Sequence, residues 1–123
     1  MTTAVRVLIA DDDPLFMDAL EAILGIESEI EVAGRAHDGE EALRLAGELE
    51  PDVVLMDLSM PVVDGFEASR RIHAAAPDTA VVVLTGSAYA EDVDKAFDAG
   101  ASDYVTKDRI AQDLVRTLLA AVG

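Results

Sequence analysis

Near its middle the chain reads Val53-Val54-Leu55-Met56-Asp57, four apolar residues followed by a carboxylate. Its apolar and β-branched character predicts a strand that is buried on both faces. The segments that follow, Ser59-Met60-Pro61 and then Asp64-Gly65, are typical of a loop. Because α/β proteins place ligands at the carboxyl ends of parallel strands, Asp57 is the first candidate functional residue.

Short apolar segments alternate along the rest of the chain with segments of helical spacing. The expected strands are residues 5–10, 30–35, 53–56, 80–84 and 103–106. This alternation predicts an α/β fold in which five parallel strands form a doubly wound sheet with helices on both faces. Strand 30–35 alternates apolar and polar residues more than the others, so we expect it at an edge. The three phenylalanines are expected in the core, with partial exposure of Phe16.

Composition bounds the class of protein. With 123 residues and 51% hydrophobic residues, the chain is expected to form one domain over residues 1–123. Its 25 acidic and 9 basic residues give a net charge of −16, which argues against direct nucleic-acid binding by this domain. The sequence has no cysteine and no apolar run near the roughly 18 residues of a membrane span. The start of the chain lacks the features of a signal peptide, so a cytoplasmic location without membrane contact is expected.

Polar residues follow four of the five expected strands. They are Asp11 and Asp12 after the first strand, Asp57 after the third, Thr85 after the fourth and Lys107 after the fifth. Because the carboxyl ends of parallel strands share one edge, these side chains are expected to meet. Oxygen-only ligands favour Mg²⁺, with Mn²⁺ as a possible substitute. A carboxylate beside such an ion can attack a phosphoryl group, whose charge the hydroxyl and the ammonium would help to stabilise.

Over its whole length the chain resembles the receiver domain of response regulators. The matching positions are Asp11-Asp12, the strand ending in Asp57 with Met60-Pro61 and Asp64-Gly65, Thr85-Gly86, and Gly100-Ala101 through Tyr104 to Lys107. Any one of these motifs is weakly specific, but all five occur in order and at matching spacing. The resemblance implies a flavodoxin-like (βα)5 fold with strand order 2-1-3-4-5.

The resemblance also implies roles for the residues of the metal site. Asp57 would be the phosphoacceptor and Asp12 a direct metal ligand, while Asp11 would act through metal-bound water. The backbone carbonyl of Ser59 would supply another ligand. Because Ser59 and Ser87 are small, we expect water to reach the phosphoryl group and autodephosphorylation not to be unusually slow.

The remaining implied roles concern the switch. Thr85 and Lys107 would bind phosphoryl oxygens, and Tyr104 would be an aromatic switch on the surface of the fourth helix, the strand 103–106 and the last helix. The phosphoryl donor would be a sensor histidine kinase or a phosphotransfer protein, and an output domain or downstream target would receive the signal. The domain would be no enzyme beyond catalysing its own phosphoryl transfer and autodephosphorylation.

Two departures from the family pattern matter. The family often has proline after the lysine, commonly with a cis bond, whereas this chain has Asp108. We therefore expect a trans bond there, with Asp108 capping the last helix. The Lys-Asp pair and the stretch from Ala10 to Leu15 resemble the subfamily whose receivers carry a C-terminal helix-turn-helix domain. Asp13 stands where that subfamily usually has His and is expected to cap the first helix. No output domain is expected within these 123 residues.

Alternatives remain open at this point. A haloacid-dehalogenase-type phosphatase would use Asp11 as nucleophile with Asp13 as its partner, although the expected threonine after Asp13 and a cap insertion are missing. A phosphorylation-independent interaction module is a third class. A further hypothesis is a homodimer, formed through the first and last helices or through the surface that carries Tyr104.

Overall fold

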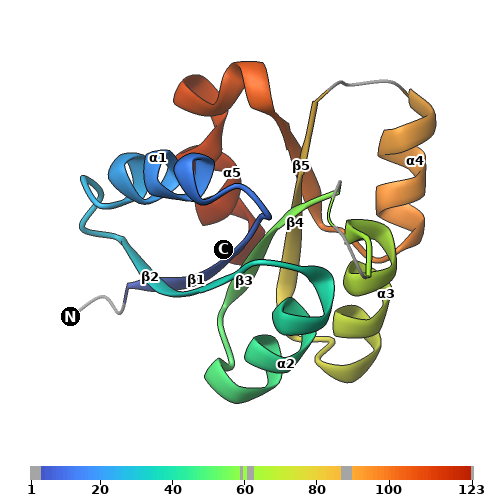
Figure 1. Cartoon of the computed structure of the whole chain (residues 1–123). Coiled ribbons are helices and arrows are strands. Elements are labelled where there is room, and N and C mark those ends of the chain that lie inside the picture. The colour runs from blue at the N-terminus through green and yellow to red at the C-terminus, as the bar shows by residue number, and fades with distance from the viewer. Residues whose placement is uncertain (1–3, 59, 61–62, 87–89, 123) are drawn as a thin grey trace.

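The computed structural model describes residues 4–58, 60, 63–86 and 90–122. Two predicted functional positions, Ser59 and Ser87, lie outside the described residues. The described chain forms five strands and five α-helices that alternate in sequence (Figure 1). No helix among the described residues is long and apolar enough to cross a membrane.

All neighbouring strands of the sheet run parallel, in the order β2-β1-β3-β4-β5. The strands are β1 (Val5–Ala10), β2 (Ile30–Ala36), β3 (Val53–Asp57), β4 (Ala80–Thr85) and β5 (Asp103–Thr106). The predicted fold class, the strand order and the edge position of β2 are therefore confirmed.

The two central strands that carry functional residues are one residue longer than predicted. Asp57 pairs in register with Leu84, and Thr85 pairs with Thr106. Both polar residues are thus the last residues of their strands instead of the first residues of a loop. Because both residues are paired within the sheet, their backbone and Cβ positions are fixed by the sheet.

The first three helices begin at a capping carboxylate. The α-helices are α1 (Pro14–Leu24), α2 (Gly39–Leu49), α3 (Gly65–Ala75), α4 (Ala90–Asp98) and α5 (Ile110–Val122). Asp13, Asp38 and Asp64 accept hydrogen bonds from backbone N–H groups in the first turns of α1, α2 and α3. The predicted capping role of Asp13 is confirmed.

The core consists of two apolar layers, one on each face of the sheet. On one face, alternate residues of the strands, such as Val7, Ile9 and Leu55, pack against α1 and α5. On the other face, residues such as Leu8 and Val54 pack against α2, α3 and α4 (Figure 1). Because both faces are covered, the central strands are apolar along nearly their whole length.

Two local predictions were wrong. Asp108 does not cap the last helix, because a 3₁₀ turn, η1 (Lys107–Arg109), contains it and leads directly into α5. Phe97 does not lie in the core, since 45% of its surface is exposed. The described residues contain no cis peptide bond, which confirms the trans bond expected between Lys107 and Asp108.

Candidate functional site

The turn between β1 and α1 holds the first acidic side chain of the site. The backbone N–H of Asp13 donates a hydrogen bond to Asp11 Oδ1 at 2.9 Å. Asp13 Oδ1 in turn accepts hydrogen bonds from the N–H groups of Leu15 at 3.0 Å and Phe16 at 3.4 Å. One turn therefore fixes the orientation of Asp11 and starts α1. Asp11 is almost completely buried, whereas Asp12 is exposed.

A glycine allows α3 to begin directly against the backbone of Asp57. A Cβ atom at position 65 would lie 2.3 Å from the carbonyl oxygen of Asp57 and 2.5 Å from the Cα of Leu58. The N–H of Gly65 donates a hydrogen bond to the carbonyl oxygen of Leu58 at 3.1 Å. The end of β3 is thus held from the β4 side by strand pairing and from the loop side by α3. Asp57 is 3% exposed.

Three carboxylates meet at this end of the sheet. Asp11, Asp12 and Asp57 each place one oxygen so that all three atoms lie within 4.8 Å of one another. Asp11 Oδ2 is buried and has no hydrogen-bond partner among the described residues. Burial raises the pKa of Asp11 from an ordinary 3.8 to about 6; the N–H of Asp13 lowers it, and the charge of Asp57 raises it further.

These observations fit a cation. Three carboxylates held this close repel one another, and a buried oxygen without a donor is costly to keep charged. A hard divalent ion relieves both costs, because it prefers oxygen ligands and carries the opposite charge. The donor set therefore fits a divalent metal ion.

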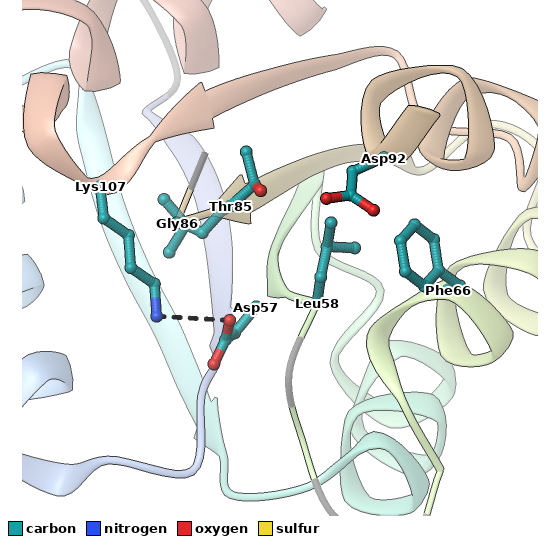
Figure 2. A pocket seen from close by; sticks show the side chains of 8 residues that line it. Asp57, Leu58, Phe66, Thr85, Gly86, Asp92 and Lys107 are labelled. Atoms are coloured by element: carbon teal, nitrogen blue, oxygen red, sulfur yellow. Dashed lines mark ion pairs between the residues drawn. The ribbon is translucent and has the colours of Figure 1, made fainter. Parts of the chain in front are cut away.

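Lys107 brings the opposite charge to the same place. Its Nζ lies 3.4 Å from Asp57 Oδ1, and its side chain is 36% exposed. Figure 2 shows the Lys107 side chain reaching Asp57 from the end of β5. An ammonium in this position can bind a second anionic group without leaving Asp57.

A cavity of about 340 Å³ opens over the end of β3 and β4. Asp57, Thr85 and Lys107 line it, together with Leu58, Phe66, Leu84, Gly86 and Asp92. Phe66 and Asp92 stand on the side away from Lys107 (Figure 2). Thr85 is 6% exposed. The cavity joins a carboxylate, an ammonium and a hydroxyl, which is the set of groups that phosphoryl transfer requires.

Tyr104 lies apart from this cavity. It stands in β5, half-buried, and its ring meets the ring of Phe97 from α4 edge-on, with centroids 6.4 Å apart and planes at 85°. Tyr104 also lines a surface cavity of about 300 Å³ with Arg109 and Asp113. The residue predicted as the switch is therefore at the surface between α4 and α5.

The structure thus gathers four of the predicted residues, Asp11, Asp12, Asp57 and Lys107, and places Thr85 on the same cavity. Asp92, which lines the cavity from α4, was not predicted as a site residue. The sequence gives no signal for it, because α4 carries several acidic residues and nothing distinguishes Asp92 from the others. Phe97 was also not predicted as the partner of Tyr104; the seven-residue spacing gave no signal because the residues lie on different elements.

The chain is similar to known proteins over most of its length. The family model of the response regulator receiver domain matches residues 7–119. The uncharacterized transcriptional regulatory protein YhcZ of Bacillus subtilis (strain 168) is 42% identical over 113 residues, which cover 92% of this chain and 53% of that protein. The transcriptional regulatory protein LiaR of the same organism is 40% identical over 117 residues, covering 95% and 56%. The chain spans about half the length of these relatives.

Solved structures agree with the fold. A two-component response regulator of the LuxR family from Aurantimonas sp. SI85-9A1 superimposes with a TM-score of 0.93 and 32% identity, over 98% of this chain and 86% of that chain. The response regulator domain of Thermotoga maritima CheB superimposes with a TM-score of 0.91 and 32% identity, over 98% and 97%.

Proposed function

Because this chain belongs to the response regulator receiver family, a family of signalling domains, we propose that it is a phosphorylation-dependent switch with Asp57 as phosphoacceptor. One observation carries the proposal. The buried carboxylate of Asp57 lies within 4.8 Å of oxygens of Asp11 and Asp12 and 3.4 Å from the ammonium of Lys107. An acid placed between a cation site and a fixed positive charge is suited to bind and attack a phosphoryl group.

The phosphoryl donor in this proposal is a phosphohistidine of a sensor histidine kinase or phosphotransfer protein. An oxygen of Asp57 forms the new P–O bond, the P–N bond to the histidine breaks, and the electron pair stays on the imidazole nitrogen. Lys107 pairs with one phosphoryl oxygen, and the hydroxyl of Thr85 donates to another. Asp11, Asp12 and Asp57 would hold Mg²⁺, or Mn²⁺ in its place, and the ion would neutralise charge on the phosphoryl oxygens. The domain then loses the phosphoryl group by autodephosphorylation.

The proposed signal begins with charge. Phosphorylation replaces the single negative charge of the Asp57 carboxylate with a phosphoryl group that carries about −1.5 to −2 and has three acceptor oxygens. Thr85 and Lys107 gain a partner that exists only in the phosphorylated state, and this differential contact shifts a pre-existing equilibrium. A shift from 1:99 to 99:1 needs about 5.5 kcal/mol of differential binding. We propose that the surface of α4, β5 and α5, where Tyr104 contacts Phe97, reports the shift to an output domain or downstream target.

The relatives support a transcriptional setting. YhcZ and LiaR are transcriptional regulatory proteins about twice as long as this chain. We therefore propose that residues 1–123 act as the receiver part of a cytoplasmic regulator, with no nucleic-acid contact by this part. Its net charge of −16 supports the last point, because DNA phosphates would be repelled.

A homodimer remains a proposal. Helices α1 and α5 bury residues such as Met17 and Leu118 in the core, but Leu15 of α1 is 79% exposed and Val122 of α5 is 40% exposed. On the other surface, Phe97 is 45% exposed beside Tyr104. Both surfaces therefore offer exposed apolar side chains to a second copy of the chain. Light scattering of the phosphorylated and unphosphorylated protein tests this.

The experiment for the function is incubation with Mg²⁺ and acetyl phosphate, followed by intact mass measurement. The wild type should gain one phosphoryl group, and removal of Mg²⁺ by a chelator should prevent the gain. Asp57→Asn should gain nothing. Asp78→Asn, which removes an exposed carboxylate elsewhere on the chain, is the matched control and should behave as wild type. Equal mass gain in wild type and Asp57→Asn refutes the assignment.

A further inference from the structure

An aromatic ring stands beside the ammonium that faces the acceptor. Lys107 Nζ lies over the ring of Phe16, 4.9 Å from its centroid, and the same nitrogen is 3.4 Å from Asp57 Oδ1. Phe16 belongs to α1 and Lys107 follows β5, so the contact joins elements on the two sides of the site. The ammonium therefore has the Asp57 carboxylate as a charged neighbour and the Phe16 ring as a neutral, electron-rich neighbour.

The ring is held by the same turn that orients the metal-site acid. The N–H of Phe16 is one of the two groups that Asp13 Oδ1 caps, and the N–H of Asp13 binds Asp11 Oδ1. The Phe16 side chain is half-buried and packs against the core layer under α1 and α5. The capped backbone and the packing against the core both restrict the position of the ring.

We propose that Phe16 is a positioning residue for Lys107, and so for phosphoryl transfer to Asp57; this inference rests on the proposed function. A ring face attracts an ammonium but accepts no strong hydrogen bond from it. The N–H groups of Lys107 are therefore kept near Asp57 and remain free for phosphoryl oxygens. A carboxylate at position 16 would hold the lysine as well, but it would compete with the phosphoryl group for those donors and add a like charge to three nearby acids.

The size of the effect follows from the exposure of Lys107. Cation–π contacts at partly exposed sites are worth a factor of about two to five in an equilibrium or a rate. We therefore expect Phe16→Leu, which keeps the apolar packing, to slow phosphorylation by acetyl phosphate about two- to fivefold. Phe16→Tyr keeps the aromatic ring and should therefore react at the wild-type rate. Ile23→Val, a half-buried substitution further along the same helix, is the control for general loosening of α1 and should have no effect.

Two readouts test the proposal. The first is the NMR signal of the Lys107 ε-methylene group, which the ring should shift upfield in the wild type and in Phe16→Tyr but not in Phe16→Leu. The second is a double-mutant cycle with Lys107→Met, in which Phe16→Leu should cause no further loss of rate. If Phe16→Leu does not fold, Phe16→Met replaces it in both measurements.

Three results would overturn the inference: a Lys107 signal at its random-coil position in the wild type, an unchanged rate in Phe16→Leu, or an equal loss in the presence and absence of Lys107. Failure of the proposed function is recognised separately, because the wild type would then take up no phosphoryl group while the NMR signal would still report the ring contact.

Discussion

Lys107 Nζ lies 3.4 Å from Asp57 Oδ1, and this ion pair links the ends of β5 and β3 across the intervening strand β4. Asp57 is 3% exposed, so its charge depends on this neighbour more than a surface acid would. We expect Lys107→Met to slow phosphorylation about 10- to 100-fold, since a hydrogen bond to a charged group is worth about 1.5–3 kcal/mol. The rate of mass gain with acetyl phosphate measures this.

The control for this prediction is another lysine on an aromatic ring. Lys95 of α4 has its Nζ 4.5 Å from the centroid of the ring of Phe66, which belongs to α3. Lys95→Met removes a similar charge without touching Asp57, so it should leave the rate of phosphorylation unchanged. Equal losses in the two variants would show that net charge, and not the position of Lys107, sets the rate.

The close approach at Gly65 predicts a large loss of stability on substitution. Gly65→Ala would place a methyl group 2.3 Å from the carbonyl oxygen of Asp57, so the backbone of α3 or β3 must move. We expect the free energy of unfolding to fall by about 3 kcal/mol. Gly47 in α2 has no atom within 4 Å of a built Cβ, so Gly47→Ala should raise it by about 0.5–1 kcal/mol. Urea denaturation measures both, and a Gly65→Ala variant as stable as wild type contradicts the close approach.

Topology explains how much of the site the sequence could predict. Asp11, Asp57, Thr85 and Lys107 each stand at or just after the carboxyl end of a strand, and a parallel sheet places all such ends at one edge whatever the details of packing. Recognising the strands was therefore enough to bring these residues together. The resemblance added the strand order and the individual roles.

Contacts between helices and the sheet could not be predicted in the same way. The positions of Asp92 and Phe16 depend on how α4 and α1 rotate about their axes. Phe97 was expected in the core because it is aromatic, but the buried side of α4 is filled by Ala96, and Phe97 turns outward to Tyr104. Asp108 is a residue type that often caps a helix, but here the 3₁₀ turn η1 already begins at Lys107 and contains Asp108. Local sequence does not settle these choices.

The raised pKa of Asp11 predicts a pH dependence of the metal-free protein. In the folded protein the pKa of the Asp11 carboxyl group is about 6, compared with an ordinary 3.8. Burial is the main cause of this rise, and the charge of Asp57 adds to it. The folded state thus binds the proton more tightly, so this contribution to stability is complete below pH 4 and is lost as the pH rises through 6. A shift of about two units corresponds to about 3 kcal/mol.

Asp11→Asn tests this dependence, since the amide oxygen can still accept the hydrogen bond from Asp13. In a chelator, the variant should be more stable than wild type at pH 7 by up to about 3 kcal/mol, and the difference should vanish near pH 4. Addition of Mg²⁺ should stabilise the wild type more than the variant, because the ion favours the charged carboxylate. Denaturation curves at both pH values, with and without Mg²⁺, measure this. A variant that is less stable at pH 7 without metal contradicts the prediction.

The hydroxyl of Thr85 is expected to couple phosphorylation to the surface at Tyr104. Thr85→Ala keeps Asp57 and Lys107, so it should still gain a phosphoryl group. It should lose most of the change in amide hydrogen exchange that phosphorylation causes in α4 and β5, because the contact that distinguishes the two states is gone. Mass spectrometry reads both the phosphoryl gain and the exchange. A full wild-type exchange response in Thr85→Ala would remove Thr85 from the switch.

The identity of the phosphorylated residue decides whether Asp57 is the phosphoacceptor. After incubation with Mg²⁺ and acetyl phosphate, reduction with borohydride converts an aspartyl phosphate to homoserine, and peptide mass spectrometry locates the converted residue. We expect homoserine at position 57 alone. Conversion at Asp11, the nucleophile of the phosphatase alternative, or at no aspartate in a protein that binds Mg²⁺, would contradict it.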